Sequence, residues 1–198
     1  MSHTRLKGSE GARVALRIMA TSDVHATLLD YDNSKDCPTT QGSLARAATG
    51  IEAARKDVPA TLLGDNGDFL EGAAIADPYE GGAGTGEENP VVQAMNALRF
   101  DAIGLGNHEF NMPAEDVRAA LLALTAPVLC ANLHLSQDRD ASVYAGLWQP
   151  NVVLTVAADD HDGGCHDLRV GLFSVLPPQV VAWDALRIAG RLVAEEMV

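Results

Sequence analysis

The sequence lacks the features of a membrane-spanning or exported chain. No hydrophobic run approaches the roughly 18 to 20 residues that a membrane span needs. The first 13 residues (MSHTRLKGSEGAR) are polar and do not contain the apolar core of a secretory signal. We therefore expect a flexible N-terminus at residues 1–13 and, for the chain as written, a cytoplasmic protein.

Cysteines are few and widely spaced. Cys37, Cys130 and Cys165 are odd in number, which fits neither a disulfide framework nor a CxxC metal site. Folding does not require a disulfide or a structural metal ion, because 198 residues with 47% hydrophobic content can bury a full hydrophobic core. We expect small buried or incidental thiols within one domain at residues 14–198.

Basic residues are outnumbered by acidic ones, 14 against 27, which leaves a net charge of −13. Because the basic residues form no cluster, neither a nucleic-acid polymer nor a membrane surface is expected as a partner. A phosphate-bearing substrate would be repelled unless its site held a strong local positive charge. A bound divalent metal ion would supply that charge.

A strand, a polar turn and a helix recur along the first two thirds of the chain. Apolar runs end in turns rich in Gly, Asp and Asn, and segments with apolar residues at helical spacing follow. Strands are expected at residues 14–22, 60–63, 102–105 and 127–131, and helices at residues 42–56, 91–98 (with Asn89 as N-cap and Pro90 at the first position) and 113–124. This alternation predicts a parallel sheet whose ligand site lies at the carboxyl ends of the strands.

The last third of the chain has a different pattern. Residues 148–157 and 168–175 are β-rich, and the turn Asp162-Gly163-Gly164 between them predicts a hairpin in a second, partly antiparallel sheet. Residues 180–198 form an amphipathic stretch, whose helical spacing predicts one shared side. That side consists of Ala182, Leu186, Ala189 and Val193.

Three polar turns carry residues that suit a metal ion. The first holds Asp23 and His25, the second (GDNGD) holds Asp65 and Asp68, and the third (GNHE) holds Asn107 and His108. Each is also explained as an ordinary solvated turn when it is taken alone. Together they follow three strands of one parallel sheet, and their carboxylate, imidazole and amide groups suit Mn, Fe, Zn or Co. The conjunction predicts a metal site.

The segments around these turns, SDVHATLLDYD, LLGDNGDFLEG and IGLGNHEFN, resemble the calcineurin-like metallophosphoesterase superfamily and, within it, the 5'-nucleotidase group. The segments YDNSKD, NGDFLEG and VLPPQVVAWD are similar to the bifunctional 2',3'-cyclic-nucleotide 2'-phosphodiesterase/3'-nucleotidase family. The resemblance implies an α/β sandwich of two mixed β-sheets flanked by helices, of which this chain is the N-terminal portion. The metallophosphoesterase domain at residues 14–198 would then be incomplete at its C-terminal end.

The resemblance also implies a chemistry and a set of residues. It implies hydrolysis of nucleotide phosphoesters by a metal-bound hydroxide, with two divalent ions (Mn, Zn, Co, Fe or Mg) as cofactors. Carried over by position, the resemblance implies that the metal ligands are Asp23, His25, the bridging Asp68, and Asn107. It implies that His108 and Asn111 are catalytic and that Asn107 and His108 contact the substrate. Asp65 and Glu109 would hold the ligands in position without binding the metal themselves. Asn111 stands where related 5'-nucleotidases have an Asp.

The sequence departs from that family in one respect. Family members complete the site with further His ligands downstream and carry a C-terminal nucleotide-binding domain, but this chain has no His from Asp167 onward. We therefore expect weak binding of the second metal ion and poor turnover by this chain. Alternatives are a phosphoesterase acting on a nucleotide sugar or a phosphoprotein, and a non-catalytic metal-binding fragment. The family resemblance also favours the periplasm or cell surface over the cytoplasm.

Other candidate residues are assigned ordinary roles. The glycines at residues 81–86 are expected to form a linker rather than a phosphate cradle, because no P-loop Lys follows them. His161, Cys165 and His166 are expected to be turn residues rather than zinc ligands. Trp148 and Trp183 are expected to be packing residues, and His134 a loop residue.

Overall fold

The computed structural model describes residues 11–40, 42–79 and 88–196. Their centre is a parallel sheet with the strand order β1-β4-β5-β6, formed by β1 (Arg17–Thr21), β4 (Thr61–Asp65), β5 (Ala102–Gly104) and β6 (Val128–Leu129). In this register Thr21 lies opposite Asp65, and Gly104 lies opposite Leu129. The predicted parallel sheet is confirmed, and the strands end at a common edge.

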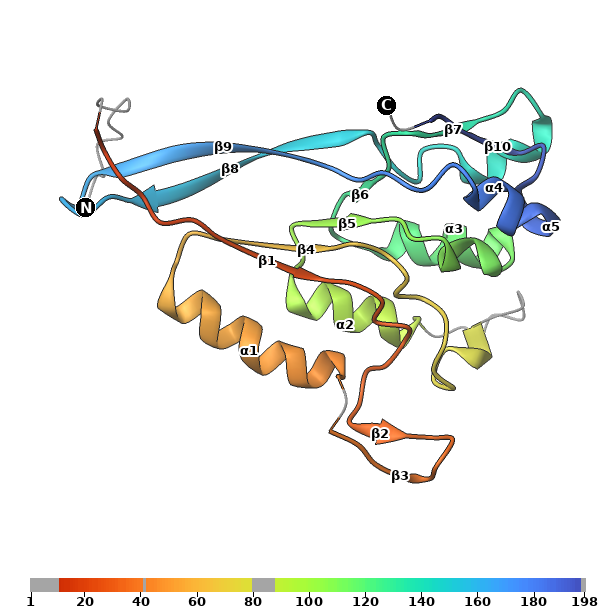
Figure 1. The fold of residues 1–198 in the computed structure, drawn as a ribbon, viewed down its shortest axis with the longest axis horizontal. Helices are drawn as coiled ribbons and strands as arrows, with labels where there is room; N and C mark the ends of the chain where they lie inside the picture. The colour runs from red at the N-terminus through yellow and green to blue at the C-terminus, as the bar shows by residue number, and fades with distance from the viewer. Residues whose placement is uncertain (1–10, 41, 80–87, 197–198) are drawn as a thin grey trace.

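Three helices connect these strands. They are α1 (Leu44–Asp57), α2 (Pro90–Leu98) and α3 (Ala114–Ala123), and Figure 1 shows α1 and α2 on one side of the sheet. Helix α2 begins as predicted, because the side chain of Asn89 accepts hydrogen bonds from the backbone N–H groups of Val91 and Val92. The apolar side chains of these helices and of the inner strands form the hydrophobic core, which includes Ile51, Leu63, Met95, Ile103 and Val117.

Antiparallel strand pairs accompany the parallel sheet in the described residues. They are β2 (Tyr31–Asp32) with β3 (Cys37–Pro38), β7 (Leu133–Leu135) with β10 (Leu192–Ala194), and the long hairpin β8 (Asn151–Asp159) with β9 (Cys165–Phe173). Figure 1 shows this hairpin extending across the molecule on the side of the sheet away from α1 and α2. The predicted hairpin is therefore confirmed, and the fold is α/β with a parallel sheet and flanking helices.

Residues 180–196 contradict the expected amphipathic side. They form two one-turn helices, α4 (Val180–Trp183) and α5 (Ala185–Ile188), followed by β10. All four residues predicted to share one side are exposed, and Val180, Ile188 and Leu192 are buried instead. Helical spacing holds only along an unbroken helix, whereas here the helix is interrupted at Asp184 and the chain turns at Gly190 with a positive φ of 79°.

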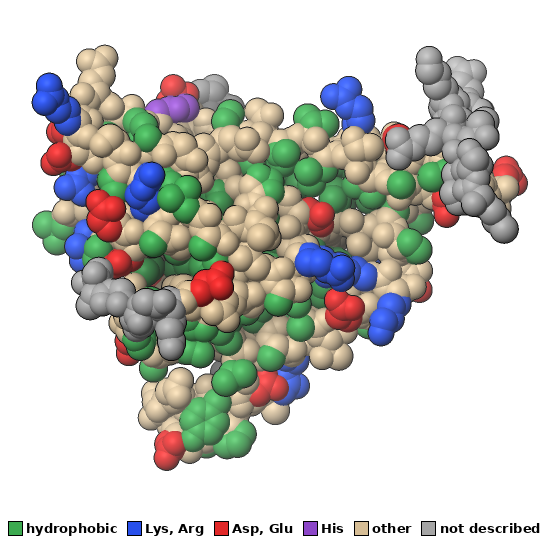
Figure 2. Space-filling model, turned by 180° about the vertical axis from the view of Figure 1, so that it is seen from behind, with side chains coloured by type: hydrophobic (Ala, Val, Ile, Leu, Met, Phe, Trp, Pro, Cys, Tyr) green, Lys and Arg blue, Asp and Glu red, His purple; other side chains and the backbone are tan. Residues whose placement is uncertain are grey.

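Surface and cysteine expectations can also be compared with the structure. As predicted, none of Cys37, Cys130 and Cys165, which all lie among the described residues, forms a disulfide. On the face shown in Figure 2, acidic and basic side chains are scattered among hydrophobic ones. Within the described segments, no helix combines the length and apolar character required to cross a membrane. The expected linker at residues 81–86 and most of the expected flexible N-terminus lie outside the described residues.

Candidate metal centre

The three polar turns follow β1, β4 and β5 and are joined to one another by backbone hydrogen bonds. The N–H of Asp23 donates to the carbonyl of Gly67 at 3.1 Å, and the N–H of His25 donates to the carbonyl of Asp68 at 2.9 Å. The N–H of His108 donates to Asp68 Oδ1 at 2.7 Å. Asp68 therefore lies between the other two turns, which meet at one edge of the sheet as the strand order requires.

The backbone of these turns adopts conformations that L-residues rarely take. Asp23, His25 and Asp68 have positive φ values of 55°, 47° and 59°. The second and third turns approach so closely that a Cβ on Gly67 would overlap the backbone of Leu105 and Gly106. Backbone strain of this kind costs free energy and is concentrated at functional sites.

Ligand atoms from all three turns converge. His25, Asp68 and His108 each offer one atom, and these atoms lie within 4.8 Å of one another. The two imidazole rings are 4.9 Å apart and nearly perpendicular, and Asp23 Oδ1 lies 3.9 Å from His25 Nε2. Imidazole and carboxylate groups at this separation suit a divalent transition metal. The sequence reasoning expected Asp23 among the ligands. In the structure, the compact cluster contains His108 instead, and Asp23 lies beside the cluster.

The two imidazoles are held in opposite tautomers. The Nδ1–H of His25 donates to the backbone carbonyl of Glu71 at 3.2 Å, which leaves the lone pair on Nε2. A carbonyl partner of this kind is typical of metal-binding histidines. His25 is therefore arranged as a ligand through Nε2.

His108 is arranged as a hydrogen-bond donor. The amide Nδ2 of Asn111 lies 2.7 Å from His108 Nδ1 and also donates to Glu71 Oε1 at 3.3 Å. Because the carboxylate of Glu71 can only accept, the amide group faces it with its N–H, and His108 Nδ1 accepts. The proton of the neutral ring then lies on Nε2. This geometry suits a residue that donates to a substrate oxygen.

Glu109 joins two of the turns from behind. Its side chain is fully buried, and Oε2 accepts from the N–H groups of Asp68 at 2.9 Å and Gly106 at 2.7 Å. Oε1 accepts from the N–H of Phe69 at 2.8 Å and, at 3.3 Å, from that of Leu70. Burial raises the pKa of Glu109, and the backbone donors act in the opposite direction. Glu109 thus supports the site without facing it.

Asp65 is buried beneath the same edge. It accepts from Thr21 Oγ1 at 2.5 Å and from the N–H of Gly67 at 2.9 Å. Burial raises the pKa of Asp65 to about 6, although these two donors counteract the rise. This burial agrees with the predicted role of Asp65, which is to support the ligand residues rather than to bind the metal.

The remaining predicted ligand, Asn107, is half-buried and precedes the 3₁₀ helix η2 (His108–Asn111). Its backbone carbonyl accepts from the N–H of Phe110 at 3.1 Å. It therefore stands directly between Gly106, which is bonded to Glu109, and His108, which is bonded to Asp68.

Two acidic residues at the site were missed by the sequence reasoning. Glu71 contacts Asn111 and lies 3.9 Å from His108 Nδ1, and its only sequence signal was its place three residues after Asp68. Asp184 has a buried Oδ2 with no hydrogen-bond partner in the described residues. Burial raises the pKa of Asp184, the charge of a protonated His108 would lower it, and the charges of Glu71 and Asp68 raise it.

Several other candidates lie elsewhere. His166 lies on β9 rather than in the turn, and its Nε2 pairs with Asp160 Oδ2 at 2.7 Å. His134 lies on β7 rather than in a loop, 3.6 Å from Glu195 Oε1. Trp148 packs near Phe110, with ring centroids 6.5 Å apart, as expected of a packing residue. Trp183 is 60% exposed, so the prediction that it is a packing residue is wrong.

Solved structures share this arrangement of sheet, helices and turns. The chain superposes on the calcineurin-like phosphoesterase YfkN from Bacillus subtilis with a TM-score of 0.80 and 30% identity, covering 92% of this chain and 55% of that one. A 5'-nucleotidase precursor from Thermus thermophilus gives a TM-score of 0.59 and 27% identity, covering 83% of this chain and 29% of that one. The chain therefore has the fold of the calcineurin-like phosphoesterases and is homologous to members of that superfamily.

Its sequence relatives are more particular. The 2',3'-cyclic-nucleotide 2'-phosphodiesterase/3'-nucleotidase of Yersinia enterocolitica is 34% identical over 190 residues, which are 96% of this chain but 28% of that protein. The 5'-nucleotidase of Bos taurus is 36% identical over 146 residues, which are 71% of this chain and 24% of that protein. No protein-family model matches the sequence. The chain is thus a homologue of nucleotide phosphoesterases and spans about a quarter of these relatives' length, as the resemblance predicted.

Proposed function

We propose that this protein hydrolyses nucleotide phosphoesters, with 2',3'-cyclic nucleotides and 3'-nucleotides as its substrates. The observation that carries the proposal is the convergence of His25, Asp68 and His108 within 4.8 Å at the ends of parallel strands. The names of the relatives support the substrate class. The charge of −13 supports a metal-dependent reaction, because a phosphoester would be repelled from an active site that lacked a strong local positive charge.

The residues of the cluster fit a divalent metal centre. His25 presents Nε2, Asp23 lies beside it, and Asp68 has one oxygen bonded to the N–H of His108 while the other remains available. Two divalent ions at such a centre would supply Lewis acidity and an activated water. We assign Asp23 and His25 to one ion, Asp68 to both and Asn107 to the second.

His108 and Asn111 would act on the substrate rather than on the metal. With its proton on Nε2, His108 donates either to a phosphate oxygen or to the leaving ribose oxygen. Asn111 holds Nδ1 and thereby fixes both the tautomer and the direction of the ring. Asn111 has no charge, so the nearby carboxylates of Glu71 and Asp184 take the place of the missing Asp as charge partners.

The second ion has few ligands in this chain. Asp68 and Asn107 are two ligands, which is fewer than tight binding normally requires. We therefore propose that the chain binds one ion more tightly than the other. We also propose that further ligands and the recognition of the base come from parts of the longer protein.

A substrate panel tests the proposal. Full-length protein loaded with Mn²⁺ should hydrolyse 2',3'-cyclic AMP and 3'-AMP faster than 5'-AMP or p-nitrophenyl phosphate. Calorimetric titration of this chain with Mn²⁺ should show one strong and one weak binding event, and Asp68→Asn should weaken both. Preference for 5'-AMP, or two equally tight ions, would contradict the assignment.

A further inference from the structure

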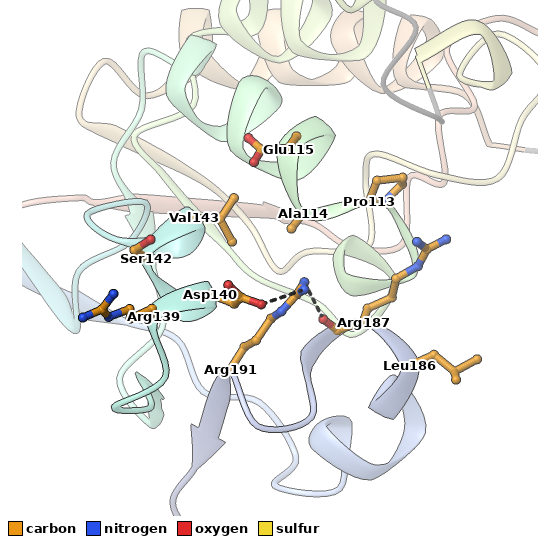
Figure 3. A pocket seen from close by; sticks show the side chains of 10 residues that line it. All are labelled: Pro113, Ala114, Glu115, Arg139, Asp140, Ser142, Val143, Leu186, Arg187 and Arg191. Atoms are coloured by element: carbon orange, nitrogen blue, oxygen red, sulfur yellow. Dashed lines mark hydrogen bonds and ion pairs between the residues drawn. The ribbon is translucent and has the colours of Figure 1, made fainter.

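A second charged site lies on another part of the molecule. An open cavity of about 530 Å³ is lined by the first turn of α3, by the 3₁₀ helix η3 (Arg139–Tyr144) and by α5 (Figure 3). Arg139, Arg187 and Arg191 line it, and they are three of the 14 basic residues of a chain with net charge −13. None of the residues of the candidate metal centre lines this cavity.

The guanidinium groups are incompletely neutralised. Among the described residues, no carboxylate forms an ion pair with Arg139 or Arg187, and Arg191 lies 4.0 Å from Asp140 Oδ2. Arg191 Nη1 also donates to the backbone carbonyl of Arg187 at 3.2 Å, as Figure 3 shows. With Glu115 as the other acidic lining residue, the cavity holds three positive and two negative side chains.

The start of α3 adds backbone donors. This helix of 10 residues begins after Pro113, and no side chain caps its N-terminus. Ala114 and Glu115 line the cavity, so the N–H groups of the first two helical residues lie at its wall, whereas the N–H of Asp116 donates to the carbonyl of Pro113 at 3.0 Å. The helix dipole also favours an anion at this end.

A buried hydroxyl lies close to two of the arginines. Tyr144 is only 1% exposed, and its hydroxyl forms no hydrogen bond of ordinary geometry in the described part of the chain. Burial raises the pKa of Tyr144, whereas the charge of Arg191, the N–H donors that Arg191 offers to the hydroxyl, and the charge of Arg187 act in the opposite direction. The hydroxyl is therefore near these two side chains, although Tyr144 itself does not line the cavity.

We infer that this cavity binds a phosphate-type oxyanion between Arg187, Arg191 and the N-terminus of α3. Donors approach the space from α5, from the segment before β10 and from α3. A tetrahedral oxyanion has acceptor oxygens in several directions and matches such a set better than a planar carboxylate does. In Figure 3 the head group of Arg139 points away from Arg191, which places Arg139 at the rim. This site is separate from the metal centre and does not depend on the proposed function.

Anion titration of the full chain in EDTA tests the inference, because metal-free protein cannot hold phosphate through bound ions. Inorganic phosphate, pyrophosphate and acetate are titrated calorimetrically at constant ionic strength. We expect saturable binding of phosphate and of pyrophosphate, and none of acetate. The double substitution Arg187→Gln and Arg191→Gln should weaken phosphate binding at least about tenfold, because one charge-assisted hydrogen bond already accounts for that factor.

Matched variants separate a built site from general charge. Arg169→Gln removes one positive charge from an exposed position on β9 and should leave phosphate binding unchanged. His25→Ala should also leave it unchanged, because His25 lies in the other site. Equal weakening by Arg169→Gln, loss on His25→Ala, or no saturable phosphate binding up to about 10 mM would overturn the inference. A thermal unfolding curve for the double variant in phosphate-free buffer verifies that it is folded.

Discussion

Replacing Glu109 by Gln tests how the polar turns of the candidate metal centre are held together. The carboxylate accepts from four backbone N–H groups, two at each oxygen. Gln has the same shape but only one acceptor oxygen. Whichever way its amide is turned, two buried N–H groups face an NH₂ group and lose their acceptor.

The expected cost follows from these bonds. Each lost hydrogen bond is worth about 1 to 1.5 kcal/mol, so two cost about 2 to 3 kcal/mol. The neutral amide costs less to bury than the carboxylate, whose pKa is raised by burial, and this offsets part of the loss. We expect a net destabilisation of about 2 kcal/mol, which lowers the Tm of a chain of this size by about 4 to 8 °C.

Thermal unfolding followed by circular dichroism in EDTA at pH 8 measures this effect. The matched control is Glu52→Gln on α1, where an exposed carboxylate lies 3.7 Å from Arg55 Nη1, and its change should stay within about 0.5 kcal/mol. Mn²⁺ affinity should fall with Glu109→Gln and remain unchanged in the control. A Tm for Glu109→Gln within about 1 °C of the parent would refute the claim that this carboxylate holds the turns.

Three further predictions concern the same edge of the sheet. His108→Ala should lower kcat by a factor of about 100 to 10,000 while Mn²⁺ content is retained, because His108 is assigned to the substrate; metal loss in proportion to activity would contradict that role. The raised pKa of Asp65 means that the metal-free folded state binds more protons than the unfolded state between about pH 4 and 6, so stability falls as the pH rises through that window; Asp65→Asn should reduce the fall, to which the buried Glu109 and the half-buried Asp184 also contribute, and be more stable by about 2 to 3 kcal/mol at pH 8 in urea unfolding, and an unchanged slope would argue against it. Gly67→Ala forces a methyl group against the GNHE turn at a φ of 96° and should destabilise the chain by about 3 kcal/mol or more. The control Gly50→Ala, in open space on α1, should stabilise the chain by up to about 1 kcal/mol. Similar unfolding midpoints for the two variants would contradict the close approach of the turns.

The sequence by itself determined the strand-turn-helix order and the edge at which the turns meet. These features depend on local signals, such as the Asn89-Pro90 start of α2, and on the rule that parallel strands end at one edge. For this reason Asp23, His25, Asp68 and His108 were identifiable before any coordinates. Local signals failed at residues 180–196, because helical spacing cannot reveal that a chain is interrupted at Asp184.

Only the tertiary structure decided which atoms face one another. Glu109 bonds to Phe69 across 40 positions of sequence, and Asn111 bonds to Glu71 across the same distance, so neither contact has a local signature. The opposite tautomers of His25 and His108 follow from such distant partners. The arginine-lined cavity likewise arises from α3, η3 and α5, which become neighbours only when the hydrophobic core brings them together.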